Sequence, residues 1–156
     1  MRRPLRFVAG AGLAVVLAAF LSDLLLELVH LSVDRPRPEE VAGGAVQLSH
    51  DRSWAHIPSF PSGHLVVTAA MVAATSSALP RLRSALLLYL GVVAITRILF
   101  GAHFPLDIAV GALLGWEAGL FAAGLAAAAG LLPRPETKRR TLPELGHRPQ
   151  PVVGGR

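Results

Sequence analysis

The sequence predicts an all-α fold, an integral membrane helical bundle of about four transmembrane helices. Of 156 residues, 53% are apolar and only 16% are charged, whereas a soluble domain has about 25% charged residues. The apolar residues gather in four runs, at about 7–29, 65–79, 84–100 and 106–132. A bilayer core of about 30 Å is crossed by roughly 20 helical residues. Because strands with open edges leave backbone groups unsatisfied in lipid, each run is expected to be a helix.

The first run follows a short arginine-rich segment, so it has two interpretations. Residues 1–22 could form a cleaved signal peptide, or the run could be a retained transmembrane helix. Apolar character resumes after Asp23, and no Ala-x-Ala cleavage site precedes the next polar segment. The sequence therefore favours a retained helix.

Prolines and glycines define the later runs. Pro80 and Pro133 are helix breakers that end the second and fourth runs. Within the fourth run, Gly111, Gly115 and Gly119 recur at four-residue spacing. Small residues at that spacing let another helix approach closely. This face of the fourth run is therefore expected to point into the bundle.

Lysine and arginine residues are divided unevenly between alternate connections. Eleven precede the first run, follow the second or follow the fourth, and four lie in or beside the other two connections. Because cytoplasmic segments are enriched in these residues, both termini are expected in the cytoplasm. Residues 1–133 form the predicted transmembrane domain. Residues 134–156 form a predicted disordered, basic, proline-rich cytoplasmic tail, attracted to the lipids of the membrane.

Three polar segments, residues 30–38, 61–64 and 96–107, lie at the ends of the apolar runs. Charged residues in such a chain are costly, so they are functional candidates. The net charge is +5, but the basic residues are not interleaved with aromatic ones, and we expect no nucleic-acid partner. The absence of cysteine excludes disulfides and thiolate metal sites.

The second polar segment, Pro61-Ser62-Gly63-His64, opens a predicted helix. Ser62 is expected to cap the helix, and Gly63 to let the backbone approach a ligand closely. The free N–H groups and the helix dipole favour an anion, toward which His64 would project. Taken alone, an ordinary serine-capped helix with an interfacial histidine explains these residues at least as well.

The other two segments supply further cations and one carboxylate. His103 and Asp107 are four residues apart, so on a helix the carboxylate could accept the imidazole N–H and raise the basicity of the other ring nitrogen. Arg97 could hold two phosphate oxygens at once. Arg35 and Arg37 lie in a proline-stiffened segment. The alternatives are an interfacial Arg–Asp pair in one segment and a stiff, solvated loop in the other.

In this order, RPRP, PSGH and TR-x5-H-x3-D resemble the three signature segments of the type 2 phosphatidic acid phosphatase (PAP2) superfamily, over about residues 29–107. The resemblance implies a membrane phosphatase that hydrolyses a lipid-linked phosphate or diphosphate through a phosphohistidine, without metal or other cofactor. It implies His103 as the nucleophile, Asp107 as its orienting partner, and His64 as the group that protonates the leaving group and later activates water. The implied substrate-binding residues are Arg37, Arg97, Ser62, Gly63, His30 and Arg35.

The sequence departs from the family pattern at several points. His30 stands where the family usually has lysine, and Thr96 where it usually has serine. Asp23, Glu27 and Asp34 share one stripe with His30 and could keep it protonated, or could be polar contacts between helices. Many members have six helices, so four indicate a reduced core or a homodimer whose partner supplies the others.

The resemblance leaves the substrate and two rival functions open. Phosphatidate, phosphatidylglycerol phosphate and polyprenyl diphosphate are candidates, with the site on the outer face of a prokaryotic cell (inner) membrane. Vanadate-dependent haloperoxidases share the pocket but are typically soluble. A lipid-phosphate-binding protein that lost turnover with the lysine is the other rival. In the outer loop, an interfacial role is favoured over a metal site for His50, Asp51 and His56, with Trp54 and Phe60 at the headgroup level.

Overall fold

The structure is a computed structural model that describes residues 2–41 and 57–133. The predicted cytoplasmic tail lies outside these residues. The predictions for His50, Asp51, Trp54 and His56 in the outer loop also lie outside them.

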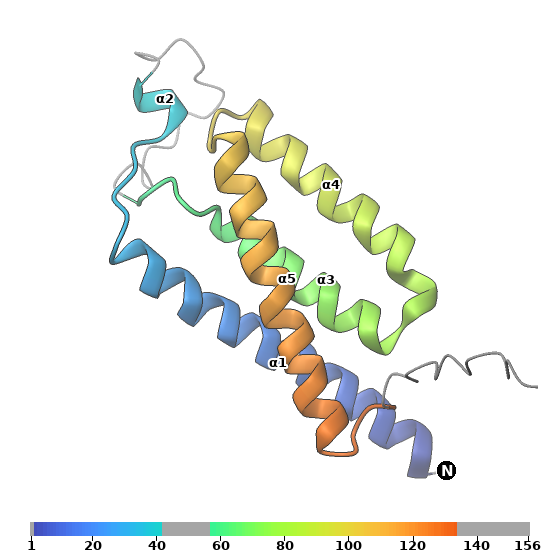
Figure 1. The fold of residues 1–156 in the computed structure, drawn as a ribbon. Helices are drawn as coiled ribbons and strands as arrows, with labels where there is room; N and C mark the ends of the chain where they lie inside the picture. The colour runs from blue at the N-terminus through green and yellow to red at the C-terminus, as the bar shows by residue number, and fades with distance from the viewer. Residues whose placement is uncertain (1, 42–56, 134–156) are drawn as a thin grey trace, which may run out of the picture.

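Throughout the described residues the secondary structure is helical, with no strand (Figure 1). Each predicted apolar run coincides with one long helix, which confirms the all-α fold. The long helices are α1 (Arg2–His30), α3 (Gly63–Ala78), α4 (Arg83–Leu99) and α5 (Pro105–Ala128), and the short ones are α2 (Pro38–Val41) and η1 (Pro80–Leu82).

Within the described residues, three segments are long and apolar enough to cross a membrane: Leu5–His30, Pro80–Leu99 and Pro105–Ala128. The fourth apolar helix, α3, has only 16 residues. It lies in the middle of the bundle, between α1 and α5 on one side and α4 on the other. The outer helices expose large apolar side chains, and α4 has no buried residue at all. Such surfaces are suited to lipid, because the acyl chains are as apolar as a leucine side chain and an exposed leucine there costs no free energy.

The glycine ridge of α5 packs directly on α3. A Cβ atom on Gly111 would lie 2.8 Å from the carbonyl oxygen of Ser62. On Gly115 and Gly119 it would lie 2.0 and 2.2 Å from the carbonyl oxygens of Val66 and Ala70. Any side chain larger than hydrogen would therefore push the two helices apart. This confirms the prediction that the ridge points into the bundle.

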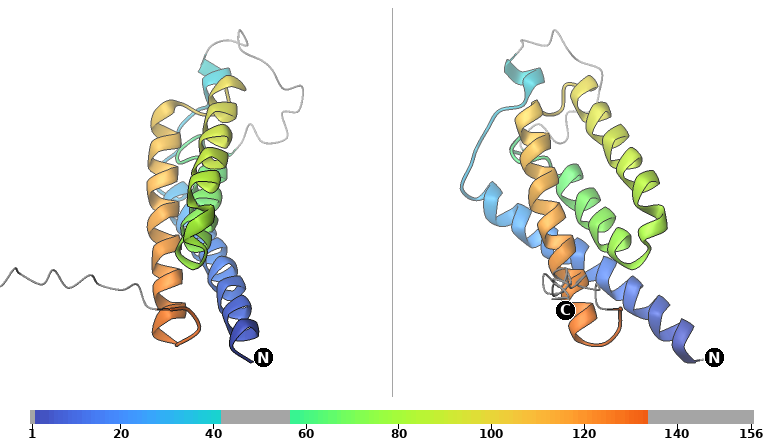
Figure 2. Two further views of the ribbon diagram at one scale, coloured as in Figure 1. Left: turned by 90° about the vertical axis from the view of Figure 1, so that its right-hand side faces the viewer. Right: turned by 45° about the vertical axis from the view of Figure 1, so that its right-hand side comes forward.

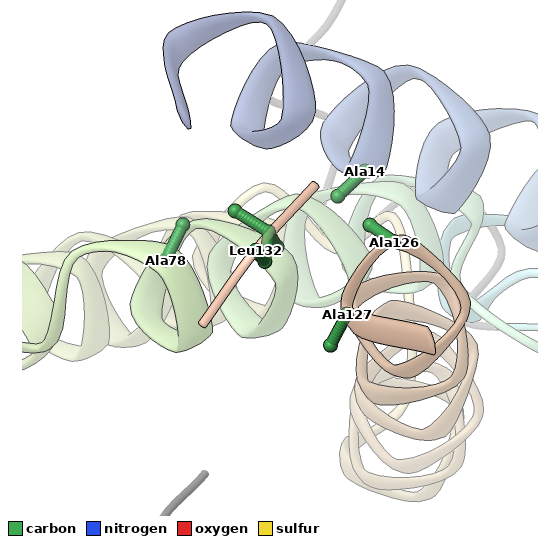
Figure 3. Packing of buried hydrophobic residues seen from close by; sticks show 5 residues of the cluster. All are labelled: Ala14, Ala78, Ala126, Ala127 and Leu132. Atoms are coloured by element: carbon green, nitrogen blue, oxygen red, sulfur yellow. The ribbon is translucent and has the colours of Figure 1, made fainter. Parts of the chain in front are cut away.

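Alanines make up most of the buried apolar residues. At the end of the bundle that contains the first turns of α1, a cluster joins α1, α3, α5 and the residue that folds back after α5 (Figure 3). Small side chains let the backbones approach, and close van der Waals contact is what holds helices together in lipid. The cluster consists of Ala14, Ala78, Ala126, Ala127 and Leu132.

The three polar segments meet at the opposite end of the bundle. Because α1, α3, α4 and α5 run alternately up and down, the α1–α3 and α4–α5 connections share one end, and η1 lies at the other (Figure 2). Hydrogen bonds connect the segments: Ser59 N–H, just before the second segment, donates to the Arg35 carbonyl of the first at 2.8 Å, and Ser62 N–H of the second segment donates to the Asp107 carbonyl of the third at 3.1 Å. The topology thus brings residues more than 40 positions apart into one site.

Candidate active site

Asp107 lies at the centre of the site. It is fully buried in the first turn of α5, where its Oδ2 accepts the backbone N–H of Phe104 at 2.9 Å and closes the helix N-terminus. The same oxygen accepts the hydroxyl of Ser59, and Oδ1 accepts an N–H of Arg35 at 2.7 Å. Both carboxylate oxygens are therefore hydrogen-bonded, as a buried charge requires.

The prediction of a hydrogen bond between Asp107 and His103 is wrong. Nδ1 of His103 is 4.0 Å from Oδ2 of Asp107, too far for a hydrogen bond. The prediction assumed that both residues lie on one helix, but α5 begins at Pro105. His103 is therefore in the preceding turn, where helical four-residue spacing does not apply.

His103 is instead held by Ser59. Its Nδ1 lies 2.8 Å from the Ser59 carbonyl oxygen, and because a carbonyl can only accept, Nδ1 must carry the proton. In the neutral ring, Nε2 then keeps its lone pair. Burial, the largest effect, lowers the pKa of His103 from 6.5 to about 4. The hydrogen bond to the Ser59 carbonyl acts in the other direction and raises this pKa. The charge of Arg37 lowers this pKa further, Asp107 raises it, and His64 lowers it. Near pH 7 the imidazole is neutral and suited to act as a nucleophile.

The two arginines of the first segment have different partners. Arg37 is 5% exposed; its Nε donates to the Ile57 carbonyl at 3.2 Å and its NH1 to the Ala102 carbonyl at 3.1 Å. Arg37 thus joins the first segment to the chain before the second segment and, beside His103, to the third. Arg35 pairs with Asp107, and its guanidinium lies 4.4 Å from the ring centroid of Phe104. Its predicted role in binding substrate stays a prediction.

His64 and Arg97 form the open side of the site. His64 is exposed at the start of α3, and its Nε2 is 3.4 Å from NH1 of Arg97 at the end of α4. Nε of Arg97 and the hydroxyl of Ser62 are buried without a hydrogen-bond partner in the described part of the chain. Buried unpaired polar atoms are rare because each costs about 1–3 kcal/mol. An anion bound beside them would satisfy these donors.

The start of α3 differs in two ways from the predicted cap. Ser62 is at the N-cap position, but its hydroxyl makes no cap hydrogen bond, so that part of the prediction is wrong. Its N–H is bonded to the Asp107 carbonyl and is not directed to a ligand. Gly63 has a packing role, since a Cβ atom there would lie 2.9 Å from Cδ2 of Leu26 on α1. The first N–H groups of α3 itself remain suited to an anion.

His30, at the end of α1, is half-buried, and its Nε2 has no hydrogen-bond partner among the described residues. Asp23, Glu27 and Asp34 are exposed, and within residues 2–41 and 57–133 none lies at ion-pair distance from His30. They therefore form no ion pair with His30 in this structure, and whether they keep it protonated stays a prediction. Whether His30 takes the place of the family's lysine stays a prediction.

Ser59 is the site residue that the sequence did not indicate. It lies outside the three segments, and its hydrogen bonds reach 44 and 48 positions along the chain. No periodicity or spacing links residues so far apart. Its only sequence signal is its place just before the Pro61-Ser62-Gly63-His64 segment.

Fold and site together define a helical membrane protein with a cluster of arginines and histidines at one end of the bundle. The chain belongs to the PAP2 superfamily, whose family model matches residues 8–130. This confirms the resemblance.

Two kinds of curated relative are similar to this chain. Lipid A 1-phosphatase of Rhizobium etli is 31% identical over 127 residues, which cover 81% of this chain and 55% of the relative. Decaprenylphosphoryl-5-phosphoribose phosphatase of Mycobacterium tuberculosis is 35% identical over 122 residues, 76% of this chain and 59% of the relative. The chain thus spans a little over half the length of these relatives. No solved structure matches it significantly.

Proposed function

We propose that this protein is a membrane phosphatase that hydrolyses a lipid-linked phosphate or diphosphate through a phosphohistidine, without a metal ion. The main supporting observation is the hydrogen bond from Nδ1–H of His103 to the Ser59 carbonyl, which leaves Nε2 unprotonated in the neutral ring. A buried, neutral imidazole with a fixed tautomer is a competent nucleophile.

In the first step, Nε2 of His103 attacks phosphorus. The N–P bond forms as the P–O bond to the leaving group breaks. The electron pair of the P–O bond goes to the leaving oxygen. His64 donates a proton to that oxygen, which leaves as the lipid alcohol or, from a diphosphate, as the lipid monophosphate. Because His64 is exposed at the mouth of the site, it can reach a leaving group that extends outward.

In the second step, water attacks the phosphohistidine. His64, now neutral, takes a proton from the water as the new O–P bond forms. The N–P bond breaks, its electron pair returns to Nε2, and inorganic phosphate leaves. The acid of the first step is thus the base of the second, and both histidines return to their starting states.

Arg37 and Arg97 supply the positive charge that phosphoryl transfer needs. Catalysis of this reaction depends on positioning and on stabilising charge on the equatorial oxygens. The Asp107 carboxylate does not neutralise the charges of Arg37 and Arg97, because it is already paired with Arg35. Two guanidiniums and the first N–H groups of α3 can take the place of a metal ion.

The substrate that fits best carries its phosphate on a lipid. The site lies at the end of helices whose outer apolar faces contact the bilayer, so a lipid headgroup is presented directly to it. The names of both kinds of relative also describe lipid-linked phosphates. We propose the outer face of a prokaryotic cell membrane as the location, with both termini in the cytoplasm, from the uneven distribution of Lys and Arg.

Phosphate release by the purified protein tests the function. Phosphatidate, phosphatidylglycerol phosphate, polyprenyl diphosphate and lipid A would each be supplied in mixed micelles with EDTA present. We expect release from at least one substrate, and its loss in His103→Ala. No release from any substrate, with binding retained, would favour the lipid-phosphate-binding alternative. Release that EDTA abolishes would contradict metal independence.

A further inference from the structure

We infer that Ser59 is a positioning residue through which Asp107 orients His103. The carboxylate holds the serine, and the serine holds the imidazole. The inference rests on the proposed function, in which His103 is the nucleophile, and adds to it the residue that determines how this nucleophile is held.

Ser59 bonds to the first and the third polar segments at once, and it lies just before the second. Its N–H donates to the Arg35 carbonyl at 2.8 Å, its carbonyl accepts the Nδ1–H of His103 at 2.8 Å, and its hydroxyl donates to Oδ2 of Asp107. The residue is fully buried. All of its polar groups are therefore used, and none of these three bonds can be exchanged for water without opening the site.

The link from Asp107 to His103 has two steps. A hydroxyl that donates to a buried carboxylate makes a charge-assisted bond, roughly twice as strong as a neutral one. This bond and the bond to Arg35 hold Ser59 from both sides, so they fix the direction in which its carbonyl points. The carbonyl in turn fixes the proton of His103 on Nδ1.

A carbonyl and a carboxylate would have different effects on the imidazole. A carboxylate bonded directly to Nδ1 would favour the charged imidazolium, which has no lone pair for attack. With Ser59 in between, the Asp107 charge stays 4.0 Å away, and the charge of Arg37 opposes it. The arrangement orients the nucleophile and keeps it neutral.

Ser59→Ala is the direct test, measured as phosphate release over a range of pH. Loss of a bond to a charged group should lower kcat by roughly 10- to 100-fold, with KM changed less because Ser59 is not placed against the substrate. Without the hydroxyl, the Asp107 carboxylate is no longer held by Ser59 and can approach Nδ1, so the acid limb of kcat/KM should move to higher pH. The other charged groups that act on His103, Arg37 and His64, are unchanged in this variant.

A matched pair separates the hydroxyl from the packing. Ser59→Thr keeps the hydroxyl, whereas Ser59→Val replaces it by a methyl group in a side chain of nearly the same shape as threonine. The Ser59→Thr variant should keep much of the activity, and the Ser59→Val variant should not. Ser22→Ala is the control, because Ser22 is equally buried but donates to the Ala19 carbonyl within α1. It should leave kcat and the pH profile unchanged.

A double-mutant cycle tests whether Ser59 and Asp107 act as one unit. If Asp107 acts through Ser59, Ser59→Ala combined with Asp107→Asn should lose no more activity than the worse single variant. Fully additive losses would mean that the two residues act independently and would overturn the inference.

The outcomes separate this inference from the proposed function. Failure of the wild-type protein to release phosphate from any lipid would reject the function itself. An active wild type, together with a Ser59→Ala variant of unchanged kcat and unchanged acid limb, would reject only the role of Ser59. Equal activity of Ser59→Thr and Ser59→Val would do the same, even if Ser59→Ala fails to fold.

Discussion

Asp107 makes its ion pair with Arg35, at 2.7 Å, and not with His103, which is 4.0 Å away. The pair joins the segment after α1 to the first turn of α5, across 72 positions of the chain. The carboxylate that sequence spacing assigned to the histidine is therefore the anchor of the first polar segment. It can influence His103 through Ser59 and through its charge.

Under the proposed function, the pH dependence of phosphate release by the wild-type protein should reflect a nucleophile, His103, that is neutral near pH 7. Burial, the dominant effect, lowers the pKa of His103 from 6.5 to about 4 by disfavouring the charged imidazole. Because attack needs the neutral ring, the His103-dependent limb of kcat/KM should stay flat through pH 6.5 and fall only toward pH 4. His64→Ala, which keeps His103, should retain this limb. A His103 limb near its ordinary pKa would contradict the prediction.

Replacing Asp107 should destabilise the fold as well as the site. Asp107→Asn removes the charge that faces Arg35 and weakens the bonds to Ser59 and Phe104. We expect a loss of about 2–3 kcal/mol in the free energy of unfolding, less than for a fully buried ion pair, because the Arg35 side chain is 34% exposed. Unfolding in detergent measures it. Glu117→Gln, an exposed carboxylate on the same helix, should change little.

Replacing the exposed His64 should affect kcat more than substrate binding. His64→Ala removes the proposed acid and base and should lower kcat by roughly 100-fold, because the leaving oxygen would depart unprotonated. A substrate with a better leaving group, such as a phenyl phosphate, should be much less affected. Equal losses for both kinds of substrate would show that His64 only binds.

Arg97 should not be replaceable by lysine. Arg97→Lys keeps the charge but loses the planar fork that holds two phosphate oxygens, and we expect roughly a 10- to 100-fold loss of kcat/KM. Arg81→Lys is the matched control, since Arg81 is exposed in η1 at the other end of the bundle. Full activity of Arg97→Lys would assign Arg97 a purely structural role.

Glycine positions on α5 provide a test of the packing that needs no substrate. Gly115→Ala would place Cβ 2.0 Å from the Val66 carbonyl oxygen, against backbone that cannot move without shifting α3. We expect a destabilisation of about 1–3 kcal/mol. Gly124→Ala has open space around it and should be neutral or slightly stabilising, since alanine favours helices. Equal effects of the two variants would argue against the α3–α5 contact.

Most of the fold could be predicted because its signals are local. Long apolar runs, prolines at their ends and the four-residue glycine spacing each act within one helix, and α1, α3, α4 and α5 lie where these signals predict. The gathering of the polar segments also followed from the sequence, since a chain that crosses a layer repeatedly returns to the same face at every second connection. His64, Arg97 and His103 could be predicted as site residues because their segments also resemble the PAP2 signature segments.

The hydrogen bonds inside the site could not be predicted in the same way. The spacing of His103 and Asp107 predicted contact only if both were helical, and α5 begins at Pro105, two residues after His103. The serine of the second segment, Ser62, has the residue type of a cap but does not use its hydroxyl as one. Both depend on the path of the backbone, which residue identity does not determine.

The sequence by itself determined that the protein is helical, that it crosses the membrane, and which polar residues would meet at one end. Hydrophobicity and helix period set these features, and both act over a few turns. Only the tertiary structure decided that Asp107 pairs with Arg35 and that Ser59 holds His103. Those bonds depend on distances between segments that are dozens of residues apart, and such distances follow from how the helices pack on one another, which no local pattern of residues determines.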